Sequence, residues 1–237
     1  MGECSAMKYK KVIPGTFIVR HNRFVAEVDV EDRRETVHVK NTGRCRELLV
    51  PGYTVCLAET DNPARRTRYD LIAVRKERPG KMPLLINMDS QIPNGAAVEW
   101  LQRSGMFSSA AVFRREVTYQ QSRFDIFVTD GDRKAFIEVK GVTLEHDGVA
   151  LFPDAPTERG VKHLKELAGC AAAGFESYVF FVIQMKEITR FSPHDAMHPA
   201  FGEALRQAVR AGVKILAMDC RVTPDSIQVD APVAVVL

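Results

Sequence analysis

The chain has 237 residues, of which 46% are hydrophobic and 27% are charged, so it is long enough to bury a core as one large domain or two small ones. No run of 18 apolar residues occurs, and the first twelve residues lack the apolar centre of a signal peptide, so we expect a cytoplasmic protein and no membrane span. The net charge is only +3, but residues 1–80 hold 16 lysines and arginines against 11 acidic residues, which weakly favours a polyanionic partner.

Short strands separated by turn residues fill the first third of the chain. The strands are expected at residues 16–20, 23–30, 36–40, 53–59 and 69–76. Residues 44–49, between the third and fourth strands, have the length of one or two helical turns. Five strands with a helix in this gap match the oligonucleotide/oligosaccharide-binding (OB) barrel. We therefore predict an all-β module of OB type over residues 1–85.

The pattern of predicted elements changes from strands alone to alternating helices and strands after residues 77–83, which contain two prolines and a glycine. Helices are expected at residues 96–104, 157–173 and 199–211, and strands at residues 112–119, 123–128, 134–140, 178–183 and 213–219. The long helix has Thr157 in position to cap its start and Gly174 just after its end. This alternation predicts an α/β domain with a mixed sheet over residues 86–237.

Two copies of the pattern D/E-x-K occur, at Glu138-Val139-Lys140 and at Asp132-Arg133-Lys134. About 1.5 copies are expected by chance in a chain of this composition, so the pattern carries little weight without its context. The second copy lies in a turn and has no acidic residue in register on a neighbouring strand. The first copy lies on a predicted strand and is therefore the stronger candidate for a site.

Asp130-Gly131 marks a tight hairpin turn between the strands at residues 123–128 and 134–140. Centring the turn on these two residues places Asp125 opposite Phe136 and makes Glu138 its diagonal neighbour. Strand alternation then puts Asp125, Glu138 and Lys140 on one face of the hairpin. The apolar residues fall on the other face, namely Phe124, Ile126, Val128, Ala135, Ile137 and Val139.

Two carboxylates held this close repel each other unless a cation neutralises them, and a hard divalent ion such as Mg²⁺ or Mn²⁺ suits carboxylate and water ligands. Such an ion lowers the pKa of a bound water and offsets charge on a phosphoryl group, while a neighbouring lysine orients or deprotonates that water. The trio Asp125, Glu138 and Lys140 therefore fits phosphodiester hydrolysis. An ordinary ion pair between Asp125 and Lys140 on a solvated face is the alternative.

Six stretches of the chain, in order from Met7 onward, are similar to the sugar fermentation stimulation protein A family. They read VKNTGRCRELLVPG, DNPARRTRYDL, NMDSQIPN, SRFDIF, FIEVKGVTL and FPDAPTERGVKHLKEL. The resemblance implies an OB-type barrel followed by a PD-(D/E)xK restriction-endonuclease-like domain. It also implies DNA binding and a link to the regulation of sugar (maltose) metabolism.

Matched residue by residue, the family's acid falls on Asp125, its E-V-K on Glu138 and Lys140, and a helical glutamate on Glu99. The resemblance thus implies Asp125, Glu138 and Lys140 as the catalytic residues and Asp125, Glu138 and Glu99 as the metal ligands. The sequence departs from the family pattern at Gly141, where asparagine is usual. Any role of that side chain is therefore lost in this chain.

Basic residues suited to DNA occur in two places. In the barrel they are Arg44, Arg65, Arg66 and Arg68, and on the long helix they are Arg159, Lys162 and Lys165, with His163 on the same exposed face. A solvated helix face with pairs such as Glu158 and Lys162 explains the second group equally well.

The leading hypothesis is a DNA-binding protein with a Mg²⁺-dependent nuclease-like site. A DNA-binding regulator without catalysis and an OB module for oligosaccharides are the alternatives. The sequence leaves the oligomeric state open, with a homodimer as one option.

Overall fold

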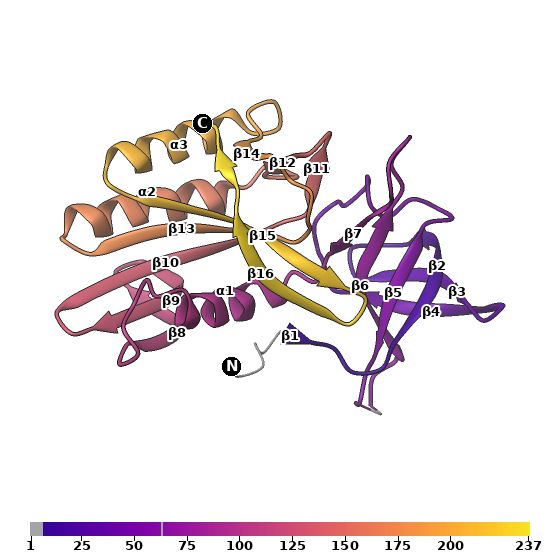
Figure 1. Cartoon of the computed structure of the whole chain (residues 1–237). Helices are drawn as coiled ribbons and strands as arrows, with labels where there is room; N and C mark the ends of the chain where they lie inside the picture. The colour runs from indigo at the N-terminus through magenta and orange to yellow at the C-terminus, as the bar shows by residue number, and fades with distance from the viewer. Residues whose placement is uncertain (1–6, 63) are drawn as a thin grey trace.

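The computed structural model describes residues 7–62 and 64–237, and it divides into a barrel and a larger α/β part that lie side by side (Figure 1). The β15–β16 hairpin of the larger part reaches across to the barrel in the same view. No helix in the described ranges is long and apolar enough to cross a membrane.

Five strands build the barrel, each overlapping a strand predicted from the sequence. They are β2 (Val12–Arg20), β3 (Val25–Val30), β4 (Arg33–Val39), β5 (Thr54–Glu59) and β6 (Tyr69–Lys76). The order is β4-β3-β2-β5-β6, and a parallel pairing of β4 with β6 closes it. This is the predicted OB-type barrel. Residues 46–48 form only a turn, in which the N–H of Leu49 donates to the carbonyl of Cys45 over 2.9 Å.

Two short strands connect the barrel to the rest of the molecule. β7 (Leu84–Asn87) pairs with β6 at the edge of the barrel sheet, so the boundary predicted between residues 85 and 86 falls inside this strand. β1 (Met7–Lys8) comes before the barrel in sequence, yet it pairs with β16 in the other sheet.

A seven-stranded mixed sheet forms the centre of the larger part, in the order β1-β16-β15-β13-β10-β9-β8. Its remaining strands are β8 (Val112–Tyr119), β9 (Ser122–Asp130), β10 (Arg133–Val142), β13 (Glu176–Ile183), β15 (Lys214–Thr223) and β16 (Ser226–Pro232). A small sheet of short strands lies beside it: β11 (Leu144–His146), β12 (Val149–Phe152), β14 (Arg190–Pro193) and β17 (Ala234–Val235). The mixed-sheet α/β prediction is confirmed.

Three helices cover the two faces of the large sheet (Figure 1). They are α1 (Ile92–Arg103) on one face, and α2 (Glu158–Ala172) and α3 (Pro199–Arg210) on the other. Ile137 and Val139 of β10 pack in the core under α1, whereas Phe136 packs in the core under α2. Alternation along the strand therefore turns Glu138 toward α2.

The register of the β9–β10 hairpin differs by two residues from the predicted one. Phe136 pairs with Phe127, and the two-residue loop is Gly131–Asp132, with Gly131 at a φ of +59° in its first position. Glycine in that position is typical of the type II′ turn. The turn is thus centred one residue later than predicted from Asp130-Gly131. Because the pairing shifts by an even number of residues, most side chains keep their predicted face.

Phe124 is the exception. Its ring packs on Phe136, with centroids 4.9 Å apart, and so lies on the α2 side of the sheet instead of with Ile126. The alternation of β9 is interrupted between these two residues, at Asp125.

Candidate metal and nuclease site

Asp125 lies where β9 and β10 part. The last backbone pair of the two strands is Ile126 with Ile137. Beyond this pair the Asp125 side chain, instead of the backbone of β9, accepts a hydrogen bond from β10. Its Oδ2 accepts the N–H of Val139 over 2.8 Å, and its Oδ1 accepts the Nδ2–H of Asn94, on the first turns of α1, over 2.9 Å. Both oxygens are therefore held, one by the strand and one by the helix.

Glu138 is almost fully buried, with 2% of its surface exposed. Its Oε1 accepts the Nζ–H of Lys140 over 2.5 Å and is in hydrogen-bond contact with Nδ1 of His163 on α2. Its Oε2 is shielded from water and has no hydrogen-bond partner within the described part of the chain. One oxygen of a buried carboxylate thus has two donors, while the other has none.

His163 belongs to this site. From the sequence it was predicted to lie on the exposed face of the long helix, and that prediction is wrong. It is buried, and Nε of Arg159 donates to its Nε2 over 3.4 Å, which leaves Nδ1 to carry the proton toward Glu138. The burial of His163 could have been predicted from its spacing along the helix. His163 stands four residues before Leu167, within the apolar stripe of α2.

The pKa values of Asp125 and Glu138 are shifted in opposite directions. Burial and the negative charge of Glu138 raise the pKa of Asp125 above its ordinary range, against the opposing effects of the Val139 N–H, Lys140 and Asn94. Burial alone would also raise the pKa of Glu138. The hydrogen bond from His163 and the charge and hydrogen bond of Lys140 outweigh burial and hold that pKa below its ordinary value.

Within the described ranges Glu99 forms no hydrogen bond or ion pair with these two carboxylates, and its Oε1 is buried without a hydrogen-bond partner. It lies five residues after Asn94, which turns it by about 140° around α1 from the residue that reaches Asp125. Burial raises the pKa of Glu99, and the charge of Arg103 opposes that effect. Among residues 7–62 and 64–237, no three His, Cys, Asp or Glu side chains lie close enough to hold a metal ion. A ligand role for Glu99 stays a prediction.

Gly141, which departs from the family pattern, has a structural reason. A Cβ at this position would lie 2.5 Å from Oε1 of Gln184 and 2.8 Å from Cγ of Pro93. A larger residue would therefore require the Gln184 side chain, just after β13, or Pro93, in the first turn of α1, to move.

The four barrel arginines predicted to contact DNA differ in whether their side chains already form ion pairs. Arg44 and Arg66 are exposed. Arg65 is engaged with Asp70, to which its Nη2 donates over 2.7 Å, and Arg68 donates to Glu59 over 3.0 Å. The contact role of all four stays a prediction.

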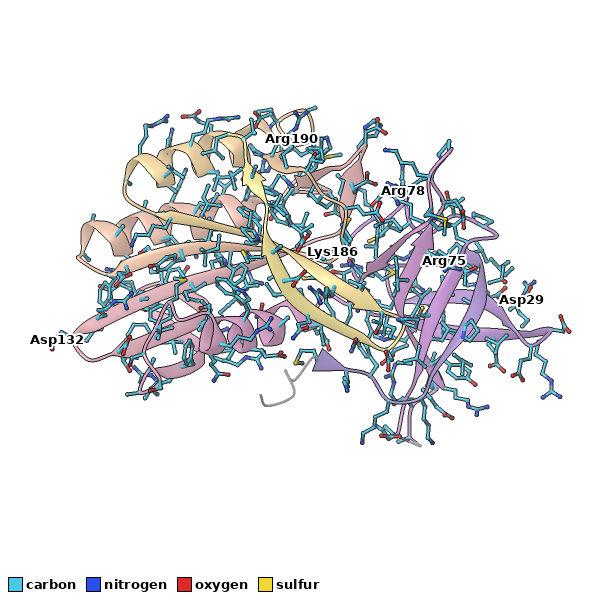
Figure 2. The ribbon with its side chains drawn as sticks, viewed as in Figure 1. Asp29, Arg75, Arg78, Asp132, Lys186 and Arg190 are labelled. Carbon is cyan, nitrogen blue, oxygen red and sulfur yellow. The ribbon has the colours of Figure 1, made fainter. Side chains whose placement is uncertain are left out.

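On α2, Arg159, Lys162 and Lys165 are exposed, and Arg159 lies nearest the site through its contact with His163. The other D/E-x-K copy is far away. Asp132 sits at the tip of the β9–β10 hairpin, at the end of the sheet remote from the barrel (Figure 2).

Comparison with known proteins supports the resemblance noted from the sequence. Residues 18–84 match the domain family described as the SfsA N-terminal OB domain, and residues 91–226 match the family described as the sugar fermentation stimulation protein RE domain. The chain belongs to the sugar fermentation stimulation protein family.

Relatives in this family are similar over nearly the full chain. A sugar fermentation stimulation protein homolog from Desulfitobacterium hafniense (strain Y51) is 57% identical and covers 94% of this chain and 95% of its own length. A homolog from Clostridium beijerinckii is 48% identical, over 98% of this chain and 100% of its own. The solved structure of Pyrococcus furiosus SfsA in complex with Ca²⁺ is 26% identical, with a TM-score of 0.85 over 98% of this chain and 99% of that one.

Proposed function

We propose that this protein binds DNA and hydrolyses its phosphodiester bonds with a divalent cation, Mg²⁺ or Mn²⁺, held by Asp125 and Glu138. The observation that carries the proposal is the Oε2 atom of Glu138, buried and without a hydrogen-bond donor beside a second carboxylate. A buried polar atom of this kind is costly unless a ligand satisfies it.

The residues fit a hard cation that also binds substrate. Mg²⁺ commonly takes one or two protein carboxylates and completes its shell with water and phosphate oxygens, so two carboxylates suffice. The Pyrococcus furiosus relative is described as a complex with Ca²⁺, another cation that prefers oxygen ligands. When bound, the cation would lower the pKa of a coordinated water and offset charge on the phosphoryl group.

Within this scheme the protein's own groups have separate tasks. Lys140, now paired with Glu138, is placed to orient or deprotonate the attacking water. His163 and Asn94 hold Glu138 and Asp125 in place from α2 and α1. Arg159 lies at the exposed side of His163, where it suits a phosphate of the bound strand.

A cleavage assay on supercoiled and single-stranded DNA, with and without Mg²⁺, tests the proposal. Asp125→Ala and Glu138→Ala should each lose both cleavage and the rise in melting temperature that Mg²⁺ produces. Lys140→Ala should lose cleavage and keep that rise. Lys134→Ala, from the D/E-x-K copy at the hairpin tip, is the matched control and should behave as wild type.

A wild-type protein that cuts no DNA and whose melting temperature ignores Mg²⁺ and Mn²⁺ would refute the enzymatic proposal. DNA binding without cleavage would instead indicate a regulator that kept the nuclease fold. Such a regulator is one route to the link with sugar metabolism that the family's name implies.

A further inference from the structure

A hollow of 620 Å³ lies between the β8–β9 turn and α2, on the same side of the sheet as Glu138. The turn curls over this side, because the ring of Tyr119 packs on Phe136 with centroids 5.1 Å apart. The lining residues are Tyr119, Gln120, Gln121, Phe124, Glu166 and Cys170.

Both walls of the hollow continue into the candidate metal site. On α2, His163, Glu166 and Cys170 follow one another at spacings of three and four residues, so they share one line along the helix. Glu166 lies about 4.5 Å along the helix axis beyond His163. On the sheet side, Phe124 directly precedes Asp125. The hollow therefore adjoins the candidate site along both α2 and β9.

Glu166 presents an unused acceptor. Its side chain lines the hollow and is 24% exposed, and its Oε1 lies 3.6 Å from Nζ of Lys162, too far for a good hydrogen bond. This carboxylate can accept a hydrogen bond from a ligand that brings an N–H group. The aromatic rings and glutamine side chains around it suit a flat ligand with polar edges.

We propose that the hollow receives one unpaired nucleobase, whose N–H edge donates to Glu166 while the adjoining phosphate lies at Asp125 and Glu138. A base is the flat, N–H-bearing group that DNA offers next to a phosphate. A hollow of this volume is of the size that holds a small molecule and is too small for a stacked base pair with its backbones. The preferred substrate is then a single strand or a frayed end. This inference rests on the proposed function.

The variant Glu166→Gln tests it, because glutamine keeps the size of the side chain and removes its charge. On circular single-stranded DNA its kcat/KM should fall about tenfold, because the neutral amide oxygen of glutamine is a weaker acceptor than a carboxylate. On relaxed circular duplex its kcat/KM should be unchanged. Glu203→Gln, on the exposed face of α3, is the matched control and should equal wild type on both substrates.

A binding measurement separates base capture from cleavage. In the Lys140→Ala background, a single-stranded oligonucleotide carrying 2-aminopurine should change its fluorescence on binding, as the base leaves its stack and enters the hollow. Adding Glu166→Gln should weaken that binding about tenfold and remove the fluorescence change. Melting curves check that each variant is folded.

The two proposals can fail separately. If Glu166→Gln has no effect, or lowers activity on both DNA forms equally, the hollow is not a base site, although hydrolysis stands. If wild type cuts no DNA but the 2-aminopurine response depends on Glu166, base capture stands and the enzymatic proposal fails. If wild type neither cuts nor binds either DNA form, both are wrong.

Discussion

Glu138 combines near-complete burial with a pKa held below the ordinary carboxyl value of 4.5. Burial acts against the charge, so the low pKa depends on Lys140 and on the imidazole of His163. In the metal-free protein the pair with Lys140 therefore stabilises the fold. The same partners hold the carboxylate in place for a cation.

The variant Glu138→Gln should lower the free energy of unfolding of the metal-free protein by about 2 kcal/mol, because Lys140 and His163 both lose the charged acceptor of their hydrogen bonds. Urea unfolding at pH 7 measures this change. Asp125→Asn is the control. Burial and repulsion already disfavour the charge at Asp125, so its neutral variant should change stability by less than about 1 kcal/mol.

The difference between wild type and Glu138→Gln should also depend on pH. Because the pKa of Glu138 is lowered in the folded protein, its contribution is fully present above pH 4.5 and is lost as the pH falls further toward the lowered pKa. The two melting temperatures should therefore converge below pH 4.5. A gap that stays constant from pH 7 to pH 3 would contradict this assignment of the charge.

Strand alternation predicted that Asp125 and Glu138 lie near each other, and a two-residue error in the turn left Glu138 on its predicted face. Asp125 reaches Glu138 for another reason, because β9 breaks its alternation there and the Asp125 side chain binds the N–H of Val139. The roles of Asn94 and His163 could not be predicted. Each comes from a helix remote in sequence, and which helical residue reaches a strand depends on packing between elements. The gap that Asp125 fills is likewise a property of two strands together.

At the scale of elements, the loop between β5 and β6 holds three of the arginines predicted to bind DNA, and their tasks differ. Arg65 pairs with Asp70, whose pKa is lowered by Arg65 and His38 in spite of burial. Arg66 is exposed. The first side chain is thus a structural part of the loop, and the second is available to a phosphate.

Arg66→Ala should weaken DNA binding for every sequence alike and reduce the slope of log affinity against log salt by about 1, without changing stability. Arg65→Ala should instead lower the free energy of unfolding by about 1 to 2 kcal/mol, since it leaves Asp70 partly buried without its guanidinium. Salt titrations of binding and urea unfolding distinguish the two. Equal salt slopes for wild type and Arg66→Ala would remove this loop from the DNA interface.

The long strands and helices could be predicted because each has enough residues to show a periodic pattern of apolar side chains. The strands β11, β12, β14 and β17 have two to four residues and show none. The strand β16 did carry a signal, since Ile227 and Val229 alternate with polar residues and are buried. The segment predicted as helical forms only a single turn within the connection of residues 40–53 between β4 and β5.

At the scale of the whole molecule, buried polar contacts join the barrel to the α/β part. Asp89, 1% exposed, pairs with Lys40 of the barrel over 2.8 Å, and its Oδ1 accepts the N–H of Gln91 at the start of α1 over 2.9 Å. Lys76 pairs with Glu145 over 2.6 Å nearby. Arg78 at the same junction, labelled in Figure 2, pairs with Glu187 over 2.8 Å.

Asp89→Asn should lower the free energy of unfolding by about 2 kcal/mol, because the half-buried Lys40 loses the carboxylate that it pairs with. It should also reduce the rise in melting temperature that Mg²⁺ produces, since the start of α1 carries the Asn94 that holds Asp125. Urea unfolding and melting curves with Mg²⁺ measure both effects. Glu116→Gln, which breaks an exposed pair with Arg123, is the control and should cost less than about 1 kcal/mol.

The pairing of β1 with β16 has a consequence for how the chain is made. A ribosome releases the N-terminus first, and the barrel strands are all present once residue 76 has emerged. Met7 and Lys8 must wait for Ile227 and Ser226, which are translated after all the other strands of that sheet. A nascent chain arrested before those residues thus contains every strand of the barrel but has β1 unpaired, and the seven-stranded sheet gains this edge strand only after β16 has been made.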